Sequence, residues 1–140
     1  MRARMMMAAC AMALAATGAA AQPSKPQERN ISTYRAAPGM QMQLLRYLAN
    51  QDAALRAIGA PACEMFAHHE GASWDYLSIC SVLTREQEKA YEVARGKMGL
   101  PSGPAEGLEL RKTIAEHSDS WVDGPMSATD MLRAVGEAPR

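Results

Sequence analysis

Apolar residues recur at helical spacing between residues 40 and 58 of this chain. Leu44, Leu48, Leu55 and Ile58 follow one another at intervals of four, seven and three residues, which places them on one face of an α-helix. Polar residues occupy most of the positions between them. The pattern therefore predicts an amphipathic helix over residues 40–58.

The same spacing, together with residues that begin and end helices, predicts further helices along the chain. They are expected at residues 62–69, at 74–83 with a continuation or restart over 85–98, at 104–117, and after Ser127. No run of four or more residues alternates polar with apolar β-branched side chains, so strands receive no support. We therefore predict an all-α fold, a small bundle of four to five short helices.

The start of the predicted helix at 85–98 carries a recognisable motif. Thr84 and Gln87 have the spacing of a capping box, and Leu83 is placed to form the hydrophobic staple. The five residues from Leu83 to Gln87 also resemble the LTxxQ motif of a family of helical periplasmic stress proteins and chaperones. That resemblance implies a helical protein that holds unfolding clients or senses metals. Because a capping box accounts for the same residues, the motif does not assign the chain to that family.

Residues 1–21 have the three parts of a secretory signal peptide. Two arginines precede an uncharged apolar run, and three alanines stand before an expected cleavage site at Gln22. We therefore predict an exported protein, periplasmic or secreted, with no stable membrane insertion once the leader is removed. The mature chain would comprise a flexible arm over residues 22–38, rich in proline, and a single all-helical domain over residues 39–140.

Removal of this leader changes both the charge and the number of cysteines. The chain has 15 basic and 15 acidic residues, and the leader holds two of the basic ones, so the mature chain has a net charge of −2. This balance argues against nucleic-acid binding. Cys10 leaves with the leader, and an oxidising compartment then favours one disulfide between Cys63 and Cys80. The disulfide would join the two helices of a hairpin over residues 62–83.

One group of residues suggests copper. Met65 and His68 would share one face of the predicted helix at 62–69, and Met40 or Met42 could approach from the first helix. Thioether and imidazole ligands together suit copper in an exported protein. We favour a structural role, because His68 and His69 near a helix C-terminus interact well with the helix dipole. No metal ligand or cofactor is therefore assigned.

Acidic residues around one predicted turn suggest a second chemistry. Glu64, Glu70 and Asp75 lie near one another in sequence, and a carboxylate pair could hydrolyse glycosidic bonds in envelope polymers. Acids beside a turn are more commonly part of a solvated surface. The chain also lacks a nucleophile elbow and a phosphate-binding glycine loop. We therefore assign no catalytic residue.

By elimination, the sequence favours a small exported protein-binding module without catalysis, such as an inhibitor, an immunity-type factor or a chaperone-like accessory. Its partner would be another envelope or secreted protein. Copper binding or metal sensing is the alternative, and hydrolysis of envelope polymers is the second alternative. Trp74 and Trp121 are expected in the core, because a domain poor in aromatic residues generally uses them there.

Overall fold

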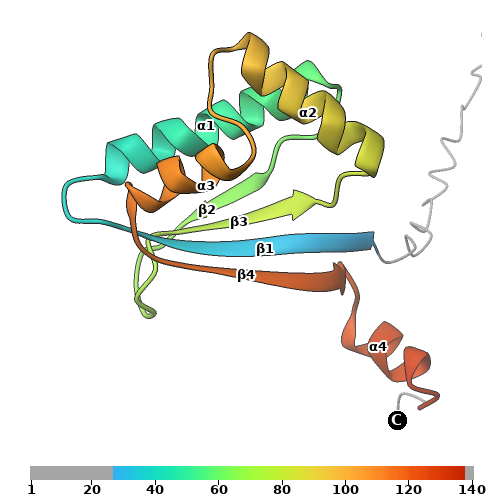
Figure 1. Ribbon diagram of the computed structural model, residues 1–140. Coiled ribbons are helices and arrows are strands. Elements are labelled where there is room, and N and C mark those ends of the chain that lie inside the picture. The colour runs from blue at the N-terminus through green and yellow to red at the C-terminus, as the bar shows by residue number, and fades with distance from the viewer. Residues whose placement is uncertain (1–26, 138–140) are drawn as a thin grey trace, which may run out of the picture.

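The computed structural model describes residues 27–137, which form a four-stranded antiparallel sheet with helices against one face (Figure 1). The strands are β1 (Gln27–Ala36), β2 (Glu64–Ala67), β3 (Tyr76–Ser81) and β4 (Ile114–Gly124). The helices are α1 (Gln41–Ala57), α2 (Arg85–Lys97), α3 (Pro104–Arg111) and α4 (Ala128–Ala134). The fold is α+β, so the prediction of an all-α bundle of four to five helices is wrong.

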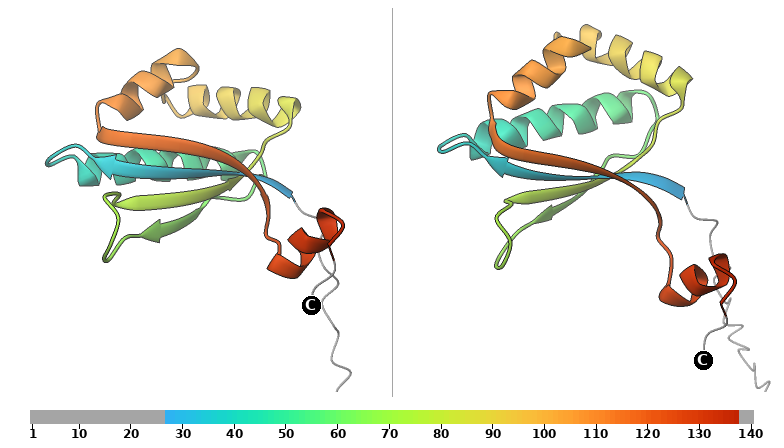
Figure 2. Two further views of the ribbon diagram at one scale, coloured as in Figure 1. Left: turned by 90° about the horizontal axis from the view of Figure 1, so that it is seen from below. Right: turned by 60° about the horizontal axis from the view of Figure 1, so that its bottom comes forward.

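The strands lie in the order β2-β3-β1-β4. The chain passes from β1 through α1 to β2, and β3 then inserts between β1 and β2 as an antiparallel neighbour of both. This arrangement is a split βαβ unit. Figure 2 shows α1, α2 and α3 on one side of the sheet, while none of the helices within residues 27–137 packs against the opposite face. We call this opposite face the open face.

β1 lies within the segment predicted to be a flexible arm, residues 22–38, so that prediction is wrong for Gln27–Ala36. Side chains alternate between the two faces of a strand. Asn30 and Ser32 lie on the helix side of β1, whereas Ile31 lies on the open face. Because polar residues point inward here, the usual signal of apolar alternation is missing.

The helical hairpin predicted over residues 62–83 is instead the β-hairpin of β2 and β3. Tyr76, Ile79 and Cys80 would share a helix face, but in a strand Ile79 and Cys80 point to opposite sides. The sulfur atoms of Cys63 and Cys80 are bonded, and their Cα atoms are 4.5 Å apart. The disulfide therefore joins β3 to the residue that precedes β2, and not two helices.

Other predicted elements agree with the structure. The helix predicted at 40–58 is α1, which buries Leu44 and Leu48 against the sheet. The capping box is formed at the start of α2, where Thr84 Oγ1 accepts from the Gln87 amide and the Gln87 side chain accepts from the Thr84 amide. The helix predicted at 104–117 ends at Arg111 as α3, and the following residues enter β4.

The hydrophobic core lies between α1 and the helix-facing side of the sheet. Its buried residues are Tyr34, Ala36, Leu44 and Leu48. Trp121 lies on β4 and is 64% exposed, so its expected place in the core is wrong. Trp74 is partly buried, and its ring centroid lies 4.6 Å from that of His68.

Two predictions concern export and membranes. The predicted signal peptide, residues 1–21, lies outside the described residues. Within residues 27–137, no helix combines the length and apolar character that a membrane span requires.

Candidate functional site

A cavity of about 420 Å³ lies between the helix-facing side of the sheet and the helices. We call it the sheet cavity. Its volume falls in the range of small-molecule pockets, about 300–1,000 Å³. The sheet contributes Asn30, Ser32, Tyr34, Cys80, Ser81, His117 and Asp119, and the helices and loops contribute Tyr47, Gln51, Leu55, Cys63, Leu83, Tyr91, Gly103, Glu106, Gly107 and Leu110. Polar groups from both layers therefore line one space between the sheet and the helices.

On the sheet side, His117 and Asp119 are alternate residues of β4 and share its helix-facing side. The Nε2 atom of His117 lies 3.2 Å from Oδ1 of Asp119. This Nε2 is buried and has no hydrogen bond of good geometry to any residue within 27–137. The His117 ring also stacks on Tyr34, with centroids 4.8 Å apart. The imidazole is therefore held in place by stacking and by a carboxylate, while its hydrogen-bonding capacity is not fully used.

Asp119 has a second neighbour across the β1–β4 ladder. The Ser32 hydroxyl lies 2.5 Å from Asp119 Oδ1 and 2.8 Å from Asn30 Oδ1. A hydroxyl has one proton, so it donates to only one of these oxygens at a time. The sheet side of the cavity thus presents more hydrogen-bond acceptors than donors.

On the helix side, polar side chains from α1 and α2 contact the carboxylate of Glu106 on α3. One oxygen, Oε1, accepts from the hydroxyl of Tyr91 at 3.2 Å, from the hydroxyl of Tyr47 at 3.4 Å and from Gln51 Nε2 at 3.3 Å. The same oxygen lies 3.0 Å from the guanidinium of Arg95. Side chains of α1, α2 and α3 are therefore tied together at one carboxylate.

Arg95 is 1% exposed, and its charge is matched within the fold. Its Nε donates to the carbonyl of Pro101 at 2.7 Å, and its NH1 group donates to the hydroxyl of Tyr91 at 3.1 Å. Burial, followed by the nearby Glu106 carboxylate, raises the pKa of Tyr91 to about 12. The same two causes raise the pKa of Tyr47. Both phenols are therefore neutral hydrogen-bonding groups at physiological pH.

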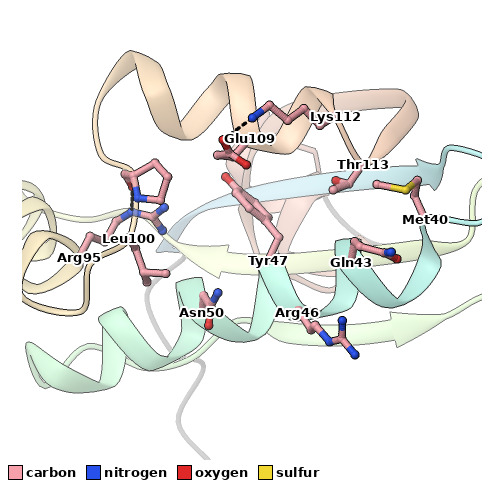
Figure 3. A pocket seen from close by; sticks show the side chains of 11 residues that line it. Met40, Gln43, Arg46, Tyr47, Asn50, Arg95, Leu100, Glu109, Lys112 and Thr113 are labelled. Atoms are coloured by element: carbon pink, nitrogen blue, oxygen red, sulfur yellow. Dashed lines mark hydrogen bonds and ion pairs between the residues drawn. The ribbon is translucent and has the colours of Figure 1, made fainter.

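A second cavity, of about 350 Å³, lies between α1 and the α2–α3 side of the molecule (Figure 3). Tyr47 lines both cavities. Around it Figure 3 shows Arg46 from α1 together with Glu109 and Lys112, which form an ion pair at 2.5 Å. The ion-paired side chains are 43% and 64% exposed. We regard the sheet cavity as the stronger candidate site, because its polar groups are more buried and come from both layers.

The copper hypothesis depended on a helix that does not form. Met65 lies in β2 and pairs with Ser78, and His68 follows the end of that strand. A spacing of three residues places two side chains on one face of a helix but on opposite faces of an extended chain. Nε2 of His68 lies against the carbonyl of Glu70. Within residues 27–137, no cluster of three or more histidine, cysteine or acidic residues could hold a metal ion.

The three acids considered for hydrolysis do not form a pair in the structure. Glu64 begins β2 opposite Ile79, whereas Glu70 lies in the loop at the other end of the hairpin. Asp75 Oδ2 accepts a hydrogen bond from the backbone amide of Ala36 at 2.8 Å. Asp75, which precedes β3, therefore holds the last residue of β1 by a hydrogen bond.

Most residues of the sheet cavity were missed by sequence reasoning. His117 and Asp119 stand two residues apart, which is the spacing of one strand face, but the segment was assigned to a helix end and a turn. Arg95 stands in a run of alternating charges that is typical of a solvated helix face, and Glu106 carries no local signal of its own. The one available signal was the alternation of Asn30, Ser32 and Tyr34, which becomes meaningful only if β1 is recognised as a strand.

Comparisons with known proteins leave the family open. No family model and no curated protein matches the chain. Among solved structures, PA3566 of Pseudomonas aeruginosa is 16% identical with a TM-score of 0.47, and the match covers 75% of this chain and 99% of that one. A dimeric ferredoxin-like protein of unknown function from Thermobifida fusca is 12% identical with a TM-score of 0.42, covering 73% and 94%. A dimeric protein of unknown function with a ferredoxin-like fold from Bacteroides fragilis is 17% identical with a TM-score of 0.39, covering 71% and 95%. The βαββαβ order and the strand order found here are those of a ferredoxin-like fold.

Proposed function

We propose that this protein is an exported binding protein for a small organic molecule, which it holds in the sheet cavity. The observation that carries this proposal is the polar lining of the cavity, in which His117 and Asp119 of β4 and Glu106 of α3 face one space. Pockets for small molecules commonly combine apolar walls with a few polar groups that fix the orientation of the ligand.

The lining indicates the chemistry of the ligand. The rings of Tyr34, Tyr47 and Tyr91, with the disulfide and leucines, provide an apolar wall for a flat ring. The carboxylate of Glu106 is balanced by Arg95, whereas Asp119 has the Ser32 hydroxyl and His117 beside it but no arginine or lysine among the described residues. The cavity therefore favours a small ring compound that donates hydrogen bonds, and a ligand carboxylate would be repelled.

Binding can be tested with three compounds of similar size, namely catechol, benzylamine and benzoate. We expect catechol or benzylamine to raise the melting temperature, by about 5 °C at ten times its dissociation constant. Benzoate should cause no shift. Changes in the amide spectrum of ¹⁵N-labelled protein should centre on the residues of β1 and β4 around His117.

Matched variants test whether the stabilising compound binds in the sheet cavity. Asp119→Asn and His117→Ala should each weaken binding of the stabilising compound. Asp123→Asn makes the same change four residues further along β4, outside the lining of the sheet cavity, and should leave binding unchanged. Equal stabilisation by benzoate, or no binding of any of the three at millimolar concentration, would refute the proposal.

Export, the absence of catalysis and an envelope partner protein remain predictions from the sequence. A disulfide between Cys63 and Cys80 supports export, because such bonds persist in oxidising compartments. Cell fractionation after expression would test the location. A cytoplasmic protein with both thiols reduced would contradict it.

A further inference from the structure

The open face of the sheet has an apolar centre. Ile31 on β1 lies opposite Ile79 on β3, and Leu77 lies opposite Phe66 at the β2 edge. None of these four side chains is fully buried, and Phe66 is 48% exposed. A monomeric protein rarely leaves the middle of a sheet face uncovered, because the apolar area then stays in contact with water.

The same chain carries a second uncovered apolar surface on α4. Figures 1 and 2 show α4 standing clear of the sheet and of α1–α3, beyond the end of β4. Its exposed side chains include Met131 at 50%, Leu132 at 39% and the adjoining Val135 at 75%. In Figure 1 the helix lies on the side of the sheet opposite α1–α3, which is the side of the open face.

A hollow joins these two surfaces. It has a volume of about 330 Å³ and is lined by Ile31, Ile79 and Val122 of the open face together with Met126, which precedes α4. Arg29 also lines the hollow, and its Nε is buried without a hydrogen bond to any described residue. The hollow and α4 therefore form one continuous surface that no residue within 27–137 covers.

Charges of both signs border this surface. Arg29 and Glu64 line the hollow, and Arg35 and Glu116 form an exposed ion pair further along the open face. A face that carries both signs can be complementary to a second copy of itself, since a two-fold axis brings each patch against its own counterpart.

We propose that two copies of this chain associate through their open faces, with α4 of each copy packed against the other. One contact then covers the sheet centre and the apolar side of α4 in both copies at once. This inference does not depend on a ligand in the sheet cavity, which lies on the opposite side of the sheet.

The test measures mass in solution by sedimentation equilibrium. The protein is purified as the expressing cells process it, with its disulfide intact, and should have twice the monomer mass at micromolar concentration. Phe66→Glu on the open face and Met131→Glu on α4 each place a charge at a proposed contact, twice per dimer. Each should weaken association by about 100-fold or more.

Leu108→Glu on α3 is the matched control, because Leu108 is 59% exposed and lies on the helix side of the sheet. It should leave the mass unchanged. Circular dichroism should show that all three variants remain folded, as expected for substitutions of exposed residues. A monomeric parent protein would overturn the proposal, and so would a dimer that tolerates Phe66→Glu and Met131→Glu as well as it tolerates Leu108→Glu.

Discussion

Arg95 offers a direct measure of how the helices are held over the sheet cavity. The perturbation is Arg95→Met, which keeps a long apolar side chain but removes the guanidinium. Glu106, with a side chain 17% exposed, would then lose its cation. The carbonyl of Pro101 would lose the donor that now lies at 2.7 Å.

The expected magnitude follows from this burial. Removing one partner of a buried ion pair costs about 3–5 kcal/mol, because the remaining charge stays in a poorly solvated place. Glu106 keeps hydrogen bonds from Tyr47, Tyr91 and Gln51, so we expect the lower end, about 3 kcal/mol. That is a large share of the roughly 5–15 kcal/mol that stabilises an ordinary domain.

The assay is urea unfolding followed by circular dichroism, with the free energy of unfolding extrapolated to water. Lys112→Met is the matched control, because it removes a cation from an exposed pair with Glu109. Exposed pairs contribute about 0–1 kcal/mol. A double variant, Arg95→Met with Glu106→Gln, should recover part of the lost stability, since no charge is then left unpaired. The reasoning fails if Arg95→Met costs no more than Lys112→Met, or if the double variant is less stable than Arg95→Met alone.

Two further predictions concern covalent stability and pH. Reduction of the Cys63–Cys80 disulfide, or its replacement by two serines, should lower the free energy of unfolding by about 3 kcal/mol, and the reductant should have no effect on the serine variant. Equal stability of oxidised and reduced protein in urea titrations would contradict this. Burial and Glu106 raise the pKa of Tyr91 from 10.0 to about 12, so the folded protein retains a proton that the unfolded chain loses. Stability should therefore be complete below pH 10 and decrease as the pH rises towards 12; Tyr91→Phe should reduce this slope in urea titrations, and an unchanged slope would exclude Tyr91 as its source.

Local signals in the sequence were sufficient to predict some helices, but they did not predict the strands. The stripe of Leu44, Leu48 and Leu55 predicted α1, and the pair Thr84 and Gln87 predicted the start of α2, because both depend on contacts within a few residues. β1 and β4 gave no such signal. Their helix-facing residues include Ser32 and Asp119, which are polar because they line a cavity.

The prediction of a helical hairpin over residues 62–83 was wrong for a related reason. β3 is a short stretch with apolar residues on both of its faces, and such a stretch fits a helix and a strand equally well. The pairing of β3 with β1, nearly fifty residues earlier in the chain, decided between them. No local pattern could indicate that pairing.

The sequence by itself determined α1, the capped start of α2 and the two cysteines that remain after the predicted leader. These depend on side-chain periodicity, local hydrogen bonds and composition. Only the tertiary structure decided that β1 pairs with β3 and with the edge strand β4, and that His117 and Asp119 face Glu106 across one cavity. Hydrogen bonds between distant strands supply the partners that polar segments need, and short-range patterns do not encode which distant segment provides them.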